Sequence, residues 1–409
     1  MKQQTGVEFF SRRVHNHELQ KNLYEPFSWY RYMRDNHPVF YDKEQQFWDV
    51  FLYDDVKQVL ENSRVFSSNR KGDDPISQSM ISLDPPKHTL MRSLVNQAFT
   101  PRVLNNWYSR IQLIARELLN EVNGQSSFDL IRKFAYPLPM IVIAEIIGVP
   151  STDRDQFKKW SDIIVSGPAD HTEEAIRLHS QKFWETMKEL RAYFFQIIDE
   201  KRKNNKEDEG ILSILIQAKQ NEKKLTDEEI LSFCILLLVA GNETTTNLIG
   251  NSIYCLLDNY QTFMEVQQNQ QLLPKAIEEV LRFRSPLQSF NRIVKEDIIL
   301  GKQLIPKGSQ IIVWIGSANR DERQFHNPDQ FDIHRSSNPH LAFGKGIHFC
   351  LGAPLARMEA KIALQELLVR YPQIKFQQPM KLEPVKSHFT YGLEHLWIEV
   401  GTSNDQNRS

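Results

Sequence analysis

The chain has 409 residues, with 50 Lys and Arg against 51 Asp and Glu, and a formal net charge of −1. No basic excess exists to neutralise phosphates, which argues against nucleic acid as a partner. Hydrophobic residues make up 41% and charged residues 25%, a globular composition that excludes a disordered chain. The length predicts two domains, unless a large buried cofactor holds one larger body together.

The three cysteines, Cys234, Cys255 and Cys350, are widely spaced and form no Cys-x-x-Cys pair. This argues against a disulfide framework, a structural zinc site and a four-cysteine iron–sulfur cluster, and it fits a reducing compartment. The N-terminal stretch is polar, and the longest strongly apolar run, Phe233 to Gly241, is short for a membrane span. We therefore expect a cytoplasmic protein without a membrane anchor.

In chain order, the N-terminal part predicts a short helix at 28–34, a β-hairpin at 38–53 and a further helix at 54–60. A long polar loop follows at 63–83, and long loops in compact proteins are often binding loops. Helical periodicity then dominates from 86 to about 281. The first two thirds of the chain thus read as mainly helical.

The last third is strand-like. Short β segments are expected at 290–294, 298–300 and 309–315, and strand character returns between 374 and 400. Between them, a segment rich in proline and asparagine leads into a glycine-rich loop. The expected class is mainly α with a smaller β region.

One long helix is predicted from about 226 to 258. It begins with Thr226 and Glu229 in the spacing of a capping box, and its first half is apolar enough to be buried. The run Ala240-Gly241-Asn242-Glu243-Thr244 then places a glycine, an acid and a hydroxyl inside this helix. Such residues lower helix stability. On its own the run reads equally well as the polar end of an amphipathic helix.

The glycine-rich loop runs from Phe343 to Gly352 and contains Cys350. A helix is predicted directly after it, with Pro354 in the first turn. The positive end of that helix favours a thiolate over a thiol. A lone cysteine is by default a small core residue, so the surrounding pattern decides its meaning.

That pattern, Phe343-x-x-Gly346-x-His348-x-Cys350-x-Gly352, resembles the cysteine-ligand loop of the cytochrome P450 superfamily of haem-thiolate monooxygenases. The resemblance implies a P450-type fold around a buried haem b, with Cys350 as the iron ligand and the long helix over the haem. Phe343, Gly346 and Gly352 would shape the cofactor pocket. The family's usual pattern has Arg where this chain has His348.

The helix run resembles the family's oxygen-activation motif, Ala240-Gly241-x-Glu243-Thr244. The resemblance implies that Gly241 opens a groove in the helix, that Thr244 hydrogen-bonds bound O2 and that Glu243 relays protons to it. Peroxide-using relatives lack this acid–alcohol pair.

Two further sets of residues carry the resemblance. Glu279-x-x-Arg282, by itself most simply a surface salt bridge, resembles a buried family pair that Arg335 would join as a structural triad. The family positions that contact the haem propionates correspond here to His88, Arg92, Arg292 and His348. Cationic donors are the expected partners of carboxylates in such a site.

The resemblance is strongest to bacilli-type hydroxylases of steroids, secosteroids, terpenoids and fatty acids. A lipophilic substrate is expected, although core packing is the default role of any one apolar residue. The expected pocket residues are Val239, Ala240, Leu287, Gln288, Ser289, Phe290, Phe389 and Thr390, with Gln288 and Ser289 as polar handles.

The expected organisation is an N-terminal extension at 1–27, a single haem domain at 28–400 and a disordered tail at 401–409. We expect a monomer that receives NAD(P)H-derived electrons from a ferredoxin or flavodoxin and its reductase. Two alternatives stay open. One is a peroxide-driven fatty-acid peroxygenase, and the other is a non-catalytic haem protein that binds a ligand.

Overall fold

The computed structural model describes residues 25–69, 78–165, 172–204, 210–220, 222–385, 387 and 389–401. They form two compact units: residues 69–108 and 139–243 make the first, and residues 25–68, 109–138 and 244–401 make the second. Most of the expected N-terminal extension, and the expected tail beyond residue 401, lie outside the described residues. A single haem domain at 28–400 stays a prediction.

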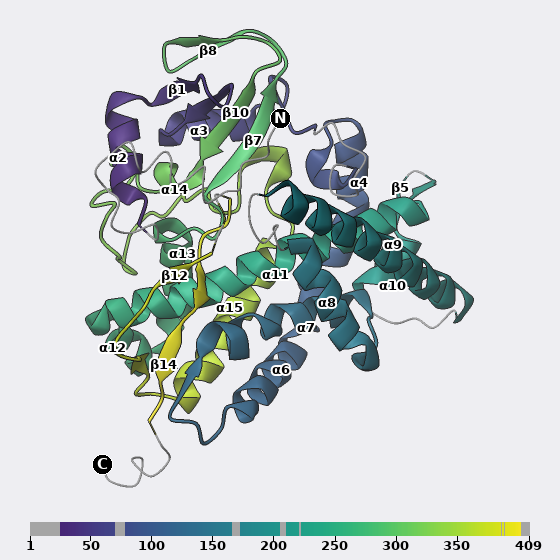
Figure 1. Ribbon diagram of the computed structural model, residues 1–409, viewed down its shortest axis with the longest axis vertical. Coiled ribbons are helices and arrows are strands. Elements are labelled where there is room, and N and C mark those ends of the chain that lie inside the picture. Colours follow the sequence, from purple (N-terminus) through teal and green to yellow (C-terminus); the bar gives the residue numbers. More distant parts are fainter. Residues whose placement is uncertain are drawn as a thin grey trace. The chain divides into compact units, whose positions relative to one another are not determined.

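The second unit contains a five-stranded sheet with the strand order β1-β2-β10-β7-β3 (Figure 1). β10 runs parallel to β2, and the other neighbours are antiparallel. The predicted hairpin is confirmed, because β1 and β2 pair in antiparallel register. The Asp42 carboxylate closes its turn by accepting hydrogen bonds from the amides of Glu44 and Gln45. The strands are β1 (Val39–Asp42), β2 (Phe47–Val50), β3 (Phe66–Ser67), β7 (Ser289–Val294) and β10 (Gln310–Trp314).

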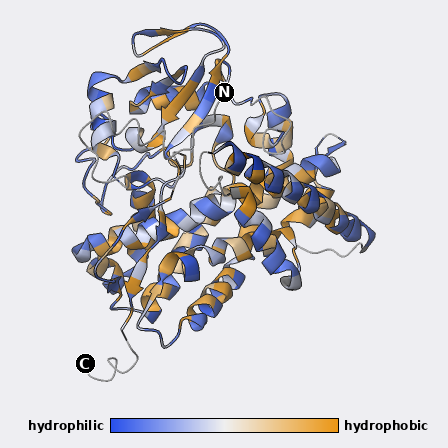
Figure 2. Ribbon diagram, viewed as in Figure 1, coloured by the Kyte–Doolittle hydropathy of each residue, from blue (hydrophilic) through white to orange (hydrophobic). Residues whose placement is uncertain are grey.

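Helices α2 (Phe27–Asn36) and α3 (Tyr53–Glu61) contribute to two hydrophobic clusters that include side chains of this sheet. Figure 2 shows hydrophobic residues in orange on β7 and β10. Phe51 stacks on Trp314, whose indole N–H donates a hydrogen bond of 2.8 Å to the buried Asp49 carboxylate. Aromatic packing therefore stabilises this part of the sheet, and the indole N–H of Trp314 satisfies the buried Asp49 carboxylate.

The remaining helices of the second unit include α13, which begins with Pro274 in its first turn and buries Leu273, Ala276, Ile277, Val280 and Leu281. Strand β4 pairs with β14 more than 260 residues later and was not expected. The helices are α6 (Tyr108–Glu121), α12 (Tyr260–Gln268), α13 (Leu273–Phe283), α14 (Ile315–Ala318) and α15 (Ala353–Arg370). The strands are β4 (Ser127–Asp129), β8 (Ile298–Leu300), β9 (Gln303–Ile305), β11 (Lys375–Phe376), β12 (Glu383–Pro384), β13 (Leu393–His395) and β14 (Trp397–Glu399).

The first unit is nearly all helical, as its sequence predicted. Phe157 of α8 packs edge-on against Phe194 of α9, and the Trp160 indole donates to Glu189 at 2.8 Å. A small hairpin of β5 (Lys219–Gln220) and β6 (Lys223–Lys224) was not expected. The helices are α4 (Lys87–Val95), α5 (Pro101–Asn105), α7 (Pro137–Ile147, mostly in this unit), α8 (Arg154–Val165), α9 (Glu173–Asn204) and α10 (Ile211–Gln217).

The predicted long helix is α11 (Asp227–Asp258), which continues from the first unit into the second. Its capping box is confirmed, because the Thr226 hydroxyl accepts from the Glu229 amide at 3.2 Å and the Glu229 carboxylate accepts from the Thr226 amide at 3.0 Å. By length and composition α11 could cross a membrane, and 67% of its most apolar window is buried inside the protein. Core helices pass the same test, so this is weak support for a membrane span.

Candidate functional site

Cys350 lies at the end of a tightly closed loop. Its amide donates a hydrogen bond of 2.9 Å to the carbonyl of Phe343, and Gly344 and Gly346 adopt φ angles of 70° and 71°, which side chains rarely take. A Cβ at Gly346 would lie 2.8 Å from the backbone oxygen of Leu60, so only glycine fits there. Helix α15 begins at Ala353, directly after Gly352. The sulfur thus precedes the positive end of an 18-residue helix.

The three cysteines differ in their surroundings. Cys234 and Cys255 are fully buried in α11, and burial raises the pKa of each thiol to about 12. Both are therefore protonated thiols at neutral pH. Cys350 is half-buried, and its Sγ lies 4.0 Å from the position that a Cβ of residue 352 would take. A side chain at residue 352 would therefore make an ordinary van der Waals contact with this sulfur.

An ion pair that the sequence did not reveal supports the cysteine loop. Arg357, in the second turn of α15, donates to Glu278 of α13 at 2.6 and 2.8 Å, and its guanidinium lies 4.5 Å from the centroid of the Phe343 ring. His340 approaches the same carboxylate at 3.1 Å. Burial alone would raise the pKa of Glu278, but the hydrogen bonds from Arg357 and His340 outweigh it and lower the pKa to about 2.

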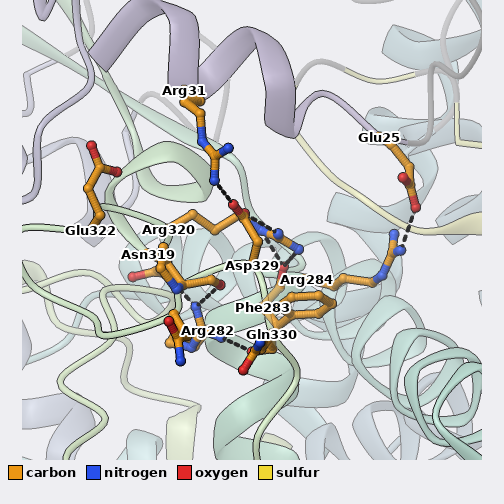
Figure 3. Close-up of polar contacts among 12 residues, drawn as sticks. Glu25, Arg31, Arg282, Phe283, Arg284, Asn319, Arg320, Glu322, Asp329 and Gln330 are labelled. Carbon is orange, nitrogen blue, oxygen red and sulfur yellow. Dashed lines mark hydrogen bonds and ion pairs between the residues drawn. The ribbon is translucent and has the colours of Figure 1, made fainter. Parts of the chain in front are cut away.

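Glu279, Arg282 and Arg335 come together as the family resemblance implied. Glu279 and Arg282 form a fully buried pair at 2.7 and 2.9 Å, and the guanidinium of Arg335 lies 3.4 Å from the same carboxylate. Arg282 also donates to the carbonyls of Asn319 and Gln330, in the segment that precedes the cysteine loop (Figure 3). The reading as a surface salt bridge is therefore wrong for this pair.

The predicted motif of α11 lies on a helix that stays regular throughout. Ala240 is exposed, and Val239, Gly241, Glu243 and Thr244 are half-buried, although the flanking turns are mostly buried. A Cβ at Gly241 would lie 2.2 Å from Cδ1 of Ile143 on α7. Gly241 therefore admits a neighbouring side chain and does not interrupt the helix. The expected groove at Gly241 stays a prediction.

The four predicted propionate contacts are divided between the two units. In the first unit, His88 and Arg92 lie one turn apart on α4. Burial, and then the charge of Arg92, lower the pKa of His88, so it is neutral at pH 7. In the second unit, Arg292 lies buried on β7, and His348 lies half-buried in the cysteine loop.

The second unit brings together most of the predicted pocket residues. Leu287 bridges to Thr390, and the rings of Phe290 and Phe389 meet edge-on at 6.2 Å. Gln288 is different. Its amide oxygen accepts from the Tyr30 hydroxyl at 2.7 Å and its Nε2 donates to the Ser285 carbonyl at 2.7 Å, so this amide is committed to the core. That geometry argues against Gln288 as a polar handle for substrate. Ser289 is also buried, at the start of β7.

Comparisons with known proteins agree with this arrangement. The family model described as cytochrome P450 matches residues 6–390. The putative cytochrome P450 YjiB of Bacillus subtilis is 47% identical over 95% of this chain and 97% of its own length. Substrate-free CYP109E1 from Bacillus megaterium is 49% identical, covers 93% of this chain and all of its own, and superposes with a TM-score of 0.90. Its testosterone complex superposes with a TM-score of 0.86 and its corticosterone complex with 0.87.

These matches span nearly the whole chain, at identities that leave no doubt about descent, and they confirm the mainly helical fold with a smaller β region. The protein belongs to the cytochrome P450 family and is a monooxygenase of that family.

Proposed function

We propose that this enzyme hydroxylates a bulky lipophilic substrate, with steroids as the best-supported class. The observation that carries the proposal is the loop around Cys350. Among the three cysteines only Cys350 is half-buried, lies ahead of a long helix and ends a loop whose Gly344 and Gly346 adopt positive φ angles. Those features fit a thiolate that binds the iron of a flat cofactor.

The other predicted cofactor residues fit the carboxylates of a haem. Arg92 and Arg292 would pair with propionates as cations, and His88 and His348 would donate N–H groups. Phe343, Gly346 and Gly352 would shape the loop against the cofactor, and the buried Glu279–Arg282–Arg335 triad would hold the segment that precedes it. The bound haem supplies the reductive activation of O2 and the insertion of one oxygen atom into a C–H bond.

The residues of α11 have the chemistry of proton delivery. The Thr244 hydroxyl can donate one proton and accept another, and the neighbouring Glu243 carboxylate can replace the proton that Thr244 gives up. Ala240 and Gly241 keep this stretch of the helix free of bulky side chains. The half-buried state of Glu243 and Thr244, within a largely buried helix, is compatible with a path that protons reach from solvent.

The substrate class rests on relatives and on apolar side chains. CYP109E1 binds testosterone and corticosterone, and it shares 49% identity with this chain. The candidate pocket residues Val239, Leu287, Phe290 and Phe389 offer apolar surface, and Thr390 offers one hydroxyl. A rigid, mostly apolar substrate with few polar groups suits such a lining. Secosteroids, terpenoids and fatty acids are the other candidate lipophilic substrates.

We further propose that NAD(P)H-derived electrons reach the enzyme through a ferredoxin or flavodoxin and its reductase, and that the protein works as a cytoplasmic monomer. The Glu243–Thr244 pair favours O2 over peroxide as the oxidant. Turnover with hydrogen peroxide but not with reduced ferredoxin would favour the peroxygenase alternative. Haem that binds ligands without any turnover would favour the non-catalytic one.

The test is a titration of the ferric holoenzyme with testosterone and with corticosterone. Binding beside the iron is expected to convert the haem from low spin to high spin in a saturable way. Turnover under 18O2, with NADPH, ferredoxin reductase and ferredoxin, should then give a product that carries one labelled oxygen atom. A spin shift and product with palmitate, but with neither steroid, would contradict the steroid assignment.

A further inference from the structure

Away from the proposed haem site, a cluster of possible metal ligands lies on the small β12–β13 hairpin of the second unit. Glu383 of β12 and Glu394 and His395 of β13 each present a ligand atom, and these atoms all lie within 4.8 Å of one another. The hairpin is labelled at β12 in Figure 1. Nothing in the proposed reaction uses these three side chains.

The strand pairing explains how they meet. Glu383 lies directly opposite His395, and opposite residues of an antiparallel pair share one face of the ladder. Glu394 would face away in a regular ladder. The register shifts between Glu383 and Pro384, and such irregularities re-aim neighbouring side chains.

A second observation concerns the orientation of His395. Its Nδ1 lies 2.5 Å from the carboxylate of Asp129, on β4. Asp129 is buried, and its other oxygen accepts from the backbone amides of Ile131 at 3.0 Å and Leu396 at 3.1 Å. A hydrogen bond that the imidazole donates through Nδ1 to this carboxylate would leave the Nε2 lone pair available to a metal ion.

A histidine held through Nδ1 by a fixed carboxylate, with Nε2 directed to a metal, is a recurrent arrangement in metal sites. We propose that Glu383, Glu394 and His395 form a binding site for a divalent transition-metal ion, and that Zn²⁺ is the ion it fits best. One imidazole with two carboxylates suits zinc, and three protein ligands leave the fourth position to water.

The site needs only small adjustments to close. Donors around tetrahedral zinc lie about 3.3 Å apart, so side-chain rotation must bring the present ligand atoms closer. Lys381 pairs with Glu383 at 2.9 Å, but 83% of its side chain is exposed, so it can move into water at little cost. The ion would hold Glu383 of β12 close to Glu394 and His395 of β13, and Phe389 and Thr390 lie between these two strands in the sequence. The metal site itself does not rest on the proposed substrate.

The experiment is equilibrium dialysis of the chelator-treated holoenzyme against Zn²⁺, followed by metal analysis. Glu394→Gln is the test variant, because within the described residues Glu394 makes no hydrogen bond or ion pair that its loss would break. Glu296→Gln, at an exposed glutamate after β7, is the matched control. We expect wild type and the control to bind one more Zn²⁺ than Glu394→Gln, or to bind it at least tenfold more tightly. Equal binding by all three proteins would overturn the site.

Hydrogen–deuterium exchange shows which segment binds the ion, and it therefore separates this site from zinc bound at other surface histidines. Zn²⁺ should slow exchange of the amides of Glu383 and of β13 severalfold in wild type and in Glu296→Gln, but not in Glu394→Gln. Slowing that is confined to other segments, or that persists in Glu394→Gln, would contradict the proposal. An unchanged Soret spectrum in all three proteins shows that each one is folded around its haem.

Discussion

Arg357 donates two hydrogen bonds, of 2.6 and 2.8 Å, to the carboxylate of Glu278. The pair joins the start of α15 to α13, and its guanidinium also lies over the Phe343 ring. Phe343 in turn closes the loop by accepting the hydrogen bond of the Cys350 amide. A charged link between two helices therefore supports the loop that carries the proposed iron ligand.

Arg357→Lys should destabilise this loop. Lysine keeps the charge but loses the two-pronged donor geometry and the flat contact with Phe343. Because the pair is about one-third exposed, we expect a loss of about 1 kcal/mol in the free energy of unfolding, measured by denaturant titration of the holoenzyme. In a Glu278→Gln background the same substitution should cost clearly less. Additive losses would show that the two residues do not act together.

The stability from Glu278 should depend on pH. Its folded pKa of about 2 lies below the ordinary value of 4.5, since hydrogen bonds from Arg357 and His340 outweigh the opposing effect of burial. A lowered folded pKa means that the contribution is complete above about pH 4.5 and is lost as the pH falls towards 2. The difference between wild type and Glu278→Gln, about 1–2 kcal/mol at pH 6 after allowance for exposure, should shrink steadily below pH 4.5. A constant difference down to pH 3 would contradict this assignment.

The effect of Gly241→Ala on the stability of the protein should depend on the side chain at residue 143. In wild type the new Cβ would meet Cδ1 of Ile143 at 2.2 Å, a clash that opposes the gain in helix propensity. Ile143→Val removes that Cδ1 atom. We therefore expect Gly241→Ala to be neutral or destabilising alone, and to stabilise by about 0.5–1 kcal/mol in the Ile143→Val background. Thermal unfolding of the four proteins measures this, and destabilisation in both backgrounds would mean that another contact excludes the side chain.

Thr244→Ala should uncouple electron use from product formation. Without the hydroxyl, residue 244 no longer directs proton delivery. More of the electrons from NADPH should then reduce O2 to hydrogen peroxide and not form product. The measurement is the ratio of product to NADPH consumed, which we expect to fall several-fold. Thr245→Ala, at the next and buried threonine, is the control and should keep most of the coupling. Unchanged coupling in Thr244→Ala would remove Thr244 from the proposed proton path.

Contacts between residues close together in the sequence could be predicted from the sequence. The Thr226–Glu229 capping box, the hairpin closed by Asp42 and the one-turn spacing of Glu279 and Arg282 all involve residues a few positions apart. Their geometry is set by helix or turn periodicity, which a sequence displays directly.

Contacts between residues far apart in the sequence could not be predicted in the same way. Glu278 is adjacent to Glu279, yet Glu278 pairs with Arg357 of α15, whereas Glu279 pairs with Arg282 of its own helix and with Arg335, and nothing local assigns Arg357 to Glu278. The pairing of β4 with β14, the close approach of Ile143 to Gly241 and the use of Gln288 by Tyr30 also depend on chain segments that meet only in the folded protein. Such contacts are chosen by packing, so they need coordinates.

The most direct test of the central claim is the absorption spectrum of the reduced, carbon monoxide-bound holoenzyme, compared with that of Cys350→Ser. Thiolate ligation by Cys350 predicts the strongly red-shifted Soret band that gives the family its name in wild type, and its loss in the variant. Cys234→Ser should keep the band, because that thiol is buried and protonated. An unshifted Soret band in wild type, or a red-shifted one in Cys350→Ser, would contradict the assignment of Cys350 as the iron ligand.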